Sequence, residues 1–355
     1  MKNEKLLIID KHQFGYLTDS FKWAEYLRNK YEVTVICINA NHKKISLENV
    51  NVRYVKCDSN YILRGIIFVI YIIKKLFLFK GKVIVVYFES CGIIKKLYKK
   101  KKILLDIRTL SVSKSKEKRL KYNDKLRNTC FLFDHVSVIS NGVRDNLRIN
   151  KENCSILPLG ADKISLKQKE YSETMKLLYV GTLSGRKIED TITGLLIFIK
   201  NQPDVKISYD IIGDGYNDEL PYLNQLIKNY KLENYVRLHG RIPYNEITPY
   251  FDECNIGVSY IPITEYFDMQ PPTKTYEYIL SGLYTIATNT YANRAIITDN
   301  NGTIIDSTPE AFAKSLNYIY KNKSNFDFNK ITKTLENNTW DKIVSNCLMP
   351  ILDKI

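Results

Sequence analysis

The chain alternates short, strongly apolar runs with longer stretches in which apolar residues recur at helical spacing. In the first half the apolar runs are not interrupted by regular polar positions, which is typical of parallel strands covered by helices on both faces. The pattern therefore predicts a doubly wound α/β sheet, each strand followed by a loop and a helix. Its predicted strands are residues 6–10, 33–38, 83–89, 103–108, 136–140 and 154–160.

The second half repeats the pattern with one regular addition, a glycine or proline at the end of each apolar run. Such residues allow a sharp turn out of the strand. Because parallel strands end at the same edge of a sheet, the turns are expected to line a crevice there. The runs are KLLYVGTL (176–183), YDIIGDG (209–215), YVRLHGRIP (235–243) and CNIGVSYIP (254–262).

At 355 residues the chain is long for one hydrophobic core, so two domains are expected. LPLGAD (157–162) reads as the connection between them because Pro158 and Gly160 interrupt it. We predict a first domain over 1–165 and a second over 170–337. An apolar-periodic helix over 338–355, with Trp340 near its start, closes the chain.

The most informative stretch is 269–289. Pro271 and Pro272 suit the entrance of a helix, and the helix is predicted from Thr273 to Ser281, with Gly282 as its stop and a strand after it. The free N–H groups of its first turn favour an anion. Lys274 and Glu277 share one face, so they can serve one ligand, the lysine binding phosphate and the carboxylate binding hydroxyls. The alternative is a surface ion pair on an ordinary helix.

Charge is distributed unevenly. Residues 1–170 hold 35 Lys and Arg against 16 Asp and Glu, or +19, and residues 171–355 hold 18 against 22, or −4. No nucleic-acid-binding signature accompanies the basic runs. The apolar segment IIFVIYIIKKLFLF (66–79), with lysines beside it, suits peripheral contact with an anionic membrane surface. The alternative is a helix buried against the sheet with a solvated basic face.

Targeting and redox features indicate a cytoplasmic protein. The first ten residues read as a strand rather than a signal peptide. The longest apolar stretch, Gly65–Ile73, is too short to span a bilayer. The seven cysteines form no CxxC pair and have no His-rich partner segment, so neither a disulfide framework nor a zinc site is indicated.

Two places in the first half could carry chemistry. The first loop holds Gly15 but no GxGxxG, so a dinucleotide cofactor is not supported; Gly15 could admit a ligand to the backbone or simply form a turn. Asp106 and Arg108 close a predicted strand at the edge where α/β sheets place ligands. The alternatives are a turn cap for Asp106 and an ion pair with it for Arg108.

The ordered motifs resemble the retaining GT-B glycosyltransferases of family 4. These motifs are LLYVGTL with Lys187, IIGDG (211–215), VRLHGRIP (236–243) and, above all, P-x-K-x-x-E-Y-x-x-x-G from Pro272 to Gly282. Gly15, DIR (106–108), VSVIS and ILPLGAD match more weakly but in order. The resemblance implies two Rossmann-like doubly wound domains facing a central cleft, with the closing helix crossing back toward the first.

The resemblance also implies roles for individual residues. Lys187, Arg186, Lys274 and the helix starting at Pro272 and Thr273 would neutralise the diphosphate of a nucleotide sugar. Glu277 would accept hydrogen bonds from ribose. Arg108, Lys187 and Glu277 are the expected catalytic residues. The remaining expected donor-binding residues are Gly15, which would approach the sugar, Thr182 and Gly213 at the strand ends, and Gly240, Arg241 and Ile242 around the base.

Three departures from the family pattern stand out. Met269 replaces the first of two glutamates spaced eight apart, Thr182 replaces an arginine, and Arg108 lies where many relatives have a histidine. These changes fit a P-x-K-x-x-E-Y subgroup. They also fit a non-catalytic relative that binds a partner. A nucleotide-sugar epimerase or hydrolase on the same fold is the other alternative, although it would need a carboxylate pair.

The implied activity is transfer of a hexosyl or N-acetylhexosaminyl group, with retention, from a nucleotide-diphosphate sugar, a UDP-sugar being favoured. No metal or other cofactor is expected, because fixed cations can stabilise the leaving diphosphate. The implied acceptor is a glycan or a polyprenyl-diphosphate-linked sugar in bacterial surface polysaccharide biosynthesis. The basic first domain would hold that acceptor at the inner face of the plasma membrane, and no nucleic-acid partner is expected.

Overall fold

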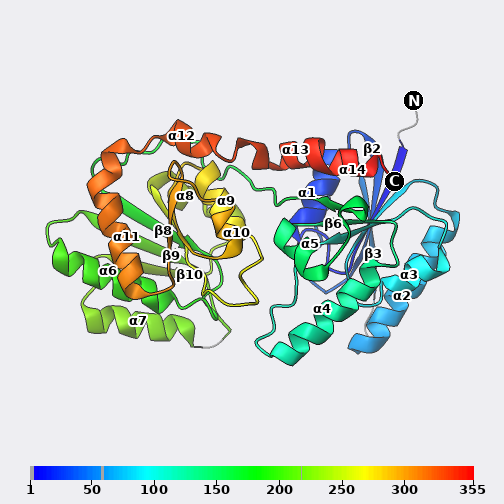
Figure 1. The fold of residues 1–355 in the computed structure, drawn as a ribbon, viewed down its shortest axis with the longest axis horizontal. Coiled ribbons are helices and arrows are strands. Elements are labelled where there is room, and N and C mark those ends of the chain that lie inside the picture. Colours follow the sequence, from blue (N-terminus) through cyan, green and yellow to red (C-terminus); the bar gives the residue numbers. More distant parts are fainter. Residues whose placement is uncertain (1–3, 57–59, 217) are drawn as a thin grey trace. The chain divides into compact units, whose positions relative to one another are not determined.

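The computed structural model describes residues 4–56, 60–216 and 218–355, and its internal contacts divide the chain into two units. The first unit is Met1–Gly160 with Trp340–Ile355, and the second is Ala161–Thr339 (Figure 1). Each unit is built on one sheet whose strands are all parallel, so the predicted doubly wound α/β class is confirmed. In the described part of the chain no helix is long and apolar enough to cross a membrane.

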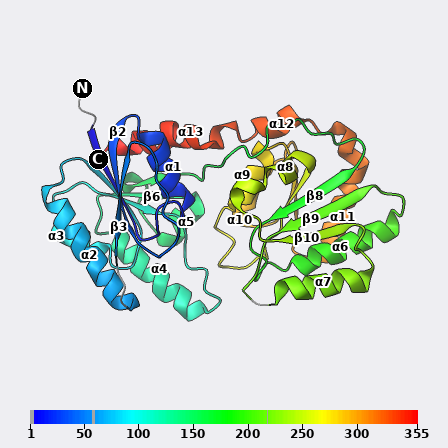
Figure 2. The same ribbon diagram turned by 180° about the vertical axis from the view of Figure 1, so that it is seen from behind.

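The first unit has a seven-stranded sheet in the order β3-β2-β1-β4-β5-β6-β7. Helix α1 lies on one face and α2, α3 and α4 on the other (Figures 1 and 2), as right-handed crossovers from a central β1 require. The strands are β1 Glu4–Asp10, β2 Tyr31–Ile38, β3 Val50–Val55, β4 Lys82–Val86, β5 Leu104–Ile107, β6 His135–Val138 and β7 Cys154–Ile156. The helices are α1 Thr18–Leu27, α2 Tyr61–Leu78, α3 Gly92–Leu97, α4 Lys116–Cys130 and α5 Asn141–Leu147.

The second unit has a six-stranded sheet in the order β10-β9-β8-β11-β12-β13. Helix α11 packs against α6, and α12 packs against α9 on the opposite face. The strands are β8 Met175–Val180, β9 Ile207–Ile212, β10 Val236–Gly240, β11 Ile256–Ser259, β12 Tyr284–Thr288 and β13 Gly302–Ile305. The helices are α6 Ile188–Asn201, α7 Glu219–Tyr230, α8 Thr248–Glu253, α9 Thr273–Leu280, α10 Tyr291–Arg294, α11 Pro309–Asn322 and α12 Phe328–Lys333.

The chain leaves the first unit at Gly160 and returns to it at Trp340. A side chain at position 160 would collide with the buried Trp340 ring, because its Cβ would lie 2.5 Å from Cε3. The next residues belong to the second unit, where Ser281 Oγ accepts hydrogen bonds from the N–H groups of Ile164 and Ser165. The division therefore precedes residue 165, the predicted end of the first domain.

The closing segment packs on α1 and is helical from Trp340 to Leu352, with a π-helical turn interrupting the α-helix. It consists of α13 Trp340–Ile343, a π-helical turn Val344–Leu348 and α14 Met349–Leu352. Pro350 explains the interruption, since its ring clashes with a carbonyl four residues earlier and it donates no hydrogen bond. That carbonyl belongs to Asn346, inside the π-helical turn.

Two strands were absent from the prediction and several predicted strands were too long. β3 is an edge strand that alternates valines with Asn51 and Arg53, and β13 is short. The strand predicted at 154–160 ends at Ile156, and that at 254–262 spans only Ile256–Ser259. The additional apolar residues leave the ladder and are buried in loops at the carboxyl edge, as Leu157 and Tyr260 are.

Candidate functional site

Helix α9 begins at Thr273, as its sequence predicts, and ends at Leu280, one residue before the predicted end. Pro272 is the residue before the first turn, and its side chain does not cap the first N–H groups. Gly282 ends it with φ +78°, and a Cβ there would lie 2.2 Å from the Phe328 ring. Tyr278 fixes the buried face of α9, because its hydroxyl accepts a 2.7 Å hydrogen bond from the N–H of Val180 at the end of β8. The first turn of α9 is thereby held beside the carboxyl end of β8.

Lys274, in this first turn, holds a buried ammonium without a hydrogen-bond partner in the described chain. Its Nζ lies 3.7 Å from the centroid of the Tyr179 ring. Burial lowers the pKa of Lys274 well below 10.5, repulsion from Arg186 lowers it further, and Glu277 opposes both. The alternative of a surface ion pair with Glu277 therefore does not describe this lysine. An anion bound beside this ammonium would complete its contacts.

Arg186 supplies a second cation near Lys274. Its guanidinium lies 4.1 Å from the centroid of the Phe267 ring, and its Nη1 is buried without a hydrogen-bond partner in the described residues. Lys187 is exposed, has φ 53°, and precedes the first turn of α6. The structure thus brings Arg186, rather than Lys187, beside Lys274.

Glu277 lies one turn further along α9 and is held by Tyr244. The Tyr244 hydroxyl lies 3.0 Å from Glu277 Oε1 and 3.4 Å from Asp162 Oδ2, and it donates to these carboxylates. Burial raises the pKa of Glu277 to about 7; the Tyr244 hydrogen bond lowers the pKa, Asp162 raises it and Lys274 lowers it. Glu277 is therefore a hydrogen-bond acceptor whose charge changes near neutral pH.

The glycines predicted at the strand ends join three strands at the same edge. Gly213 donates a 2.8 Å hydrogen bond to the carbonyl of Gly240, and a Cβ at Gly213 would lie 1.8 Å from the carbonyl oxygen of Gly181. Gly181 in turn leaves room for Lys274, whose Nζ would lie 2.9 Å from a Cβ at 181. These two close contacts, between Gly213 and Gly181 and between Gly181 and Lys274, require glycine at positions 213 and 181.

The other predicted donor-binding residues around this edge differ in exposure. Thr182 is exposed, and its hydroxyl donates a 3.4 Å hydrogen bond to the carbonyl of Asp214. Arg241 has a side chain 82% exposed, with Nη1 3.8 Å from Asp214 Oδ2. Ile242 packs against a buried cluster that includes Leu178 and Ile212. Thus Ile242 contributes packing to the core in this structure.

In the first unit the Arg108 side chain is buried and makes ion pairs and one backbone hydrogen bond, while its Nε has no hydrogen-bond partner among the described residues. Its Nη2 lies 2.6 Å from Asp19 Oδ1, and its Nη1 donates a 2.8 Å hydrogen bond to the carbonyl of Leu157. Asp106 lies 3.8 Å from Nη1, so the predicted alternative of a pair with Asp106 is present but longer than the pair with Asp19. Burial raises the pKa of Asp106 to about 7 although Arg108 lowers it.

Gly15 has φ +88°, which glycine adopts without strain. A Cβ there would lie 2.3 Å from Cδ1 of Ile45, so the first loop packs tightly at this point. This geometry suits the alternative in which Gly15 forms a turn.

Four residues of the second-unit site carried no recognised signal in the sequence: Tyr179, Phe267, Tyr244 and Asp162. Tyr179 occupies a strand position that reads as core, and Tyr244 follows GRIP directly. A polar residue just after a predicted ligand loop is the one signal that could have pointed to Tyr244.

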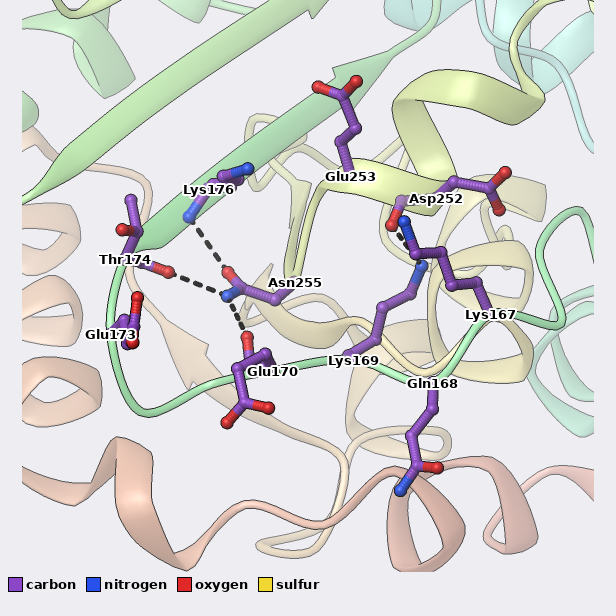
Figure 3. A pocket seen from close by; sticks show the side chains of 10 residues that line it. All are labelled: Lys167, Gln168, Lys169, Glu170, Glu173, Thr174, Lys176, Asp252, Glu253 and Asn255. Carbon is purple, nitrogen blue, oxygen red and sulfur yellow. Dashed lines mark hydrogen bonds between the residues drawn. The ribbon is translucent and has the colours of Figure 1, made fainter.

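A separate polar hollow lies near the beginning of β8, and Figure 3 shows its lining side chains. Asn255 accepts a hydrogen bond from the N–H of Lys176 and donates to the carbonyls of Glu170 and Thr174. Lys169 donates to the carbonyls of Phe251 and Asp252 at the end of α8. Because these polar groups form hydrogen bonds with one another, the residues around the hollow hold the segment that leads into β8 in place.

Part of the chain resembles a known protein family in sequence. Residues 174–322 match the family model described as "Glycosyl transferases group 1". No curated protein matches the chain in sequence.

Solved structures resemble the chain over nearly its whole length. Anabaena Alr3699/HepE in complex with UDP and glucose has 13% identity and a TM-score of 0.75, covering 99% of this chain and 100% of that one. Sucrose-phosphate synthase from Thermosynechococcus elongatus has 14% identity and a TM-score of 0.75, covering 99% and 98%. The lipopolysaccharide outer core galactosyltransferase WaaB, in its apo form, has 17% identity and a TM-score of 0.73, covering 98% and 99%. By sequence, then, residues 174–322 are similar to the glycosyl transferases group 1 family, and by structure the chain has the GT-B fold.

Proposed function

We propose that the chain is a retaining glycosyltransferase of the family 4 type that uses a nucleotide-diphosphate sugar, with UDP favoured as the nucleotide. The observation that carries the proposal is the buried ammonium of Lys274, which lies beside Arg186 and has no hydrogen-bond partner among the described residues. It lies in the first turn of a helix that also carries Glu277. Two cations and free N–H groups suit a diphosphate, and a carboxylate one turn away suits ribose hydroxyls. The Anabaena structure, which contains UDP and glucose, supports the choice of nucleotide.

The proposed chemistry follows from the position of these charges. As the bond from the anomeric carbon to the diphosphate breaks, negative charge develops on the diphosphate, and Lys274, Arg186 and the α9 N–H groups are already in place to stabilise it. The acceptor oxygen bonds to the anomeric carbon on the face that the diphosphate leaves, and its proton passes to the diphosphate. Because protein cations can do this work, transfer is expected to continue in EDTA.

The transferred group is proposed to be a hexosyl or N-acetylhexosaminyl group, and the acceptor a glycan or a lipid-linked sugar in bacterial surface polysaccharide biosynthesis. The +19 charge of residues 1–170 supports an acceptor presented at an anionic surface, such as the inner face of the plasma membrane. WaaB, a lipopolysaccharide outer core galactosyltransferase by description, makes this setting a reasonable choice.

Ligand-dependent melting tests the nucleotide site directly. UDP, GDP, ADP, CDP and NAD would each be added to wild type and to Glu277→Ala. A ligand at 100 times its dissociation constant stabilises by about 2.7 kcal/mol, which moves a melting curve by a few degrees. We expect UDP to shift wild type strongly and the variant weakly. A chain that no nucleoside diphosphate shifts would refute the proposed donor site.

A second experiment separates an enzyme from a partner-binding relative. Thr182, which occupies the usual arginine position and whose hydroxyl bonds to a backbone carbonyl, is the observation that favours the non-catalytic alternative. The protein would be incubated with UDP-sugars and lipid-linked or glycan acceptors, and the anomeric configuration of the product read by NMR. Transfer with retention is expected. UDP binding without transfer or hydrolysis would favour the partner-binding alternative, and inversion would exclude the proposed mechanism.

A further inference from the structure

Helix α2 is apolar on the face that does not pack against the first unit's sheet. Its inner face is buried through residues such as Phe68, Ile72 and Leu76. A helix of a globular domain normally carries polar residues opposite such a face. Here the outer positions are occupied by large apolar side chains, and Ile62, Phe77 and Leu78 are each more than 70% exposed.

These outer residues form one continuous stripe. Ile62, Ile66, Ile70 and Phe77 follow one another at i, i+4, i+8 and i+15, which places them on one side of an α-helix. Helix α3 packs against α2, and its Leu97 lines the same shallow hollow as Phe77. We name the α2 surface as the stripe Ile62, Ile66, Ile70 and Phe77 together with two neighbouring exposed residues, Leu78 at the end of α2 and Leu97 on α3.

Lysines surround one end of the α2 surface. Residues 60–105 contain eleven Lys and Arg and a single acidic residue, Glu89. Lys95 pairs with Asp134, and Lys101 donates to the carbonyls of Leu76 and Phe79 at the end of α2, so these two hold the helices in place. Exposed lysines that remain available to a partner are Lys74, Lys75, Lys80, Lys96, Lys99 and Lys100.

We propose that the α2 surface docks on a lipid bilayer with anionic headgroups. The isoleucines and Phe77 would enter the boundary between headgroups and acyl chains, and the lysines would bind lipid phosphates. The hollow that Phe77 and Leu97 share with Lys96, Lys99 and Lys100 joins apolar and cationic contacts in one place, as a phospholipid headgroup and its chain require.

Charge complementarity favours a bilayer over a second copy of the chain. Two α2 surfaces placed against each other would bring the same lysines into proximity, and Glu89 is the one acidic residue of residues 60–105 that could compensate. The proposal rests on the proposed function for its purpose, because a lipid-linked acceptor would be presented in the same membrane. Docking itself does not require the donor site.

Vesicle sedimentation of the full chain tests the proposal. The vesicles are phosphatidylcholine alone, or phosphatidylcholine mixed with phosphatidylglycerol. One variant removes apolar contacts, Ile66→Gln with Ile70→Gln, and another removes charge, Lys96→Gln, Lys99→Gln and Lys100→Gln. All five side chains are exposed, so folding should be preserved. Matched controls on the second unit are Leu166→Gln, and Lys200→Gln with Lys206→Gln and Lys228→Gln, at exposed positions.

We expect wild type to bind the anionic vesicles tightly and the neutral ones weakly. The lysine variant should lose about two orders of magnitude in affinity for the anionic vesicles, the isoleucine variant should bind both kinds poorly, and the controls should bind like wild type. Equal losses in variants and controls, or no binding by wild type, would overturn the proposal. So would a dimer, detected by sedimentation equilibrium, that dissociates in the isoleucine variant.

UDP-dependent melting of the same proteins separates this proposal from the proposed function. The α2 variants should keep the wild-type shift, because the nucleotide site lies in the second unit. A wild type that binds UDP but no vesicle would refute the membrane proposal and leave the transferase proposal intact. A wild type that binds vesicles but no nucleotide would refute the transferase proposal and leave the membrane proposal intact.

Discussion

The Tyr244 hydroxyl lies 3.0 Å from Glu277 Oε1, so a residue of the β10–α8 connection donates a hydrogen bond to the carboxylate of α9. This bond lowers the pKa of Glu277, which burial otherwise raises, and the pKa of Glu277 is about 7. A ribose hydroxyl is bound better by the ionised carboxylate than by the neutral acid. Tyr244 therefore helps keep Glu277 in its binding form at neutral pH.

Tyr244→Phe should raise the pH at which nucleotide affinity is lost. In wild type the affinity for UDP should fall as the pH falls through about 7, because Glu277 becomes protonated. Without the tyrosine hydroxyl the pKa of Glu277 rises, so the loss should occur at higher pH while affinity at alkaline pH stays near wild type. Titration calorimetry across pH would measure this. Glu277→Gln, which does not titrate, is the control, and an unchanged midpoint in Tyr244→Phe would contradict the role.

Lys274→Met should stabilise the free protein and abolish its response to UDP. The buried ammonium has no hydrogen-bond partner in the described chain. A buried polar group without a partner lowers the free energy of unfolding by about 1–3 kcal/mol. Methionine removes that cost and keeps the contact with Tyr179. The same change removes a cation from the proposed diphosphate site, so UDP affinity should fall by about two orders of magnitude. Urea unfolding and UDP-dependent melting measure the two effects.

The pH dependence of unfolding gives a second measure of Lys274. Its pKa is lowered in the folded protein, so the unfolded chain binds more protons between that lowered pKa and 10.5. Wild-type stability should therefore gain with rising pH across this window, and Lys274→Met should lack that gain. Lys187→Met changes an exposed lysine and serves as the control. A destabilised Lys274→Met with an intact UDP response would place the anion elsewhere.

The limits of the sequence prediction are visible at this site. The bounds of α9 were predictable because Pro272 and Gly282 are local signals that act within one turn. Which side chains meet α9 was not predictable in the same way. Phe267 and Tyr244 come from two other loops, and only tertiary packing brings them to Arg186 and Glu277.

The choice between Arg186 and Lys187 shows the same limit. The sequence places two cations in succession and does not tell which one faces α9. The backbone decides it, since Lys187 adopts a left-handed conformation at the start of α6 and its side chain is exposed. In the first unit, β3 was missed because an edge strand with one buried residue carries little hydrophobic pattern.

Asp106→Asn should flatten the dependence of stability on pH in the acidic range. Burial raises the pKa of Asp106 from 3.8 to about 7, so the folded protein binds this proton more tightly than the unfolded chain. The resulting stability is fully present below pH 3.8 and is lost as the pH rises to about 7. Asparagine cannot lose a proton and its oxygen still accepts from Ser137, whose hydroxyl lies 2.6 Å from Asp106 Oδ1. Urea midpoints across this range, with the exposed Asp204→Asn as control, measure the difference; parallel curves for wild type and Asp106→Asn would contradict it.

Gly213→Ala and Gly185→Ala separate steric exclusion from backbone conformation at the proposed donor site. Both glycines have positive φ, +156° and +69°. A Cβ at Gly213 would lie 1.8 Å from the carbonyl oxygen of Gly181, whereas a Cβ at Gly185 has no atom of the described residues within 4 Å. Gly185→Ala should therefore cost about 1–2 kcal/mol for the left-handed backbone alone. Gly213→Ala should cost at least ~3 kcal/mol, because the edge shared by β8 and β9 must open.

Displacement of Gly181 would also move the backbone beside Lys274, so Gly213→Ala should lose its UDP response while Gly185→Ala keeps it. Equal losses in unfolding free energy would show that the approach to Gly181 does not determine the geometry of this edge.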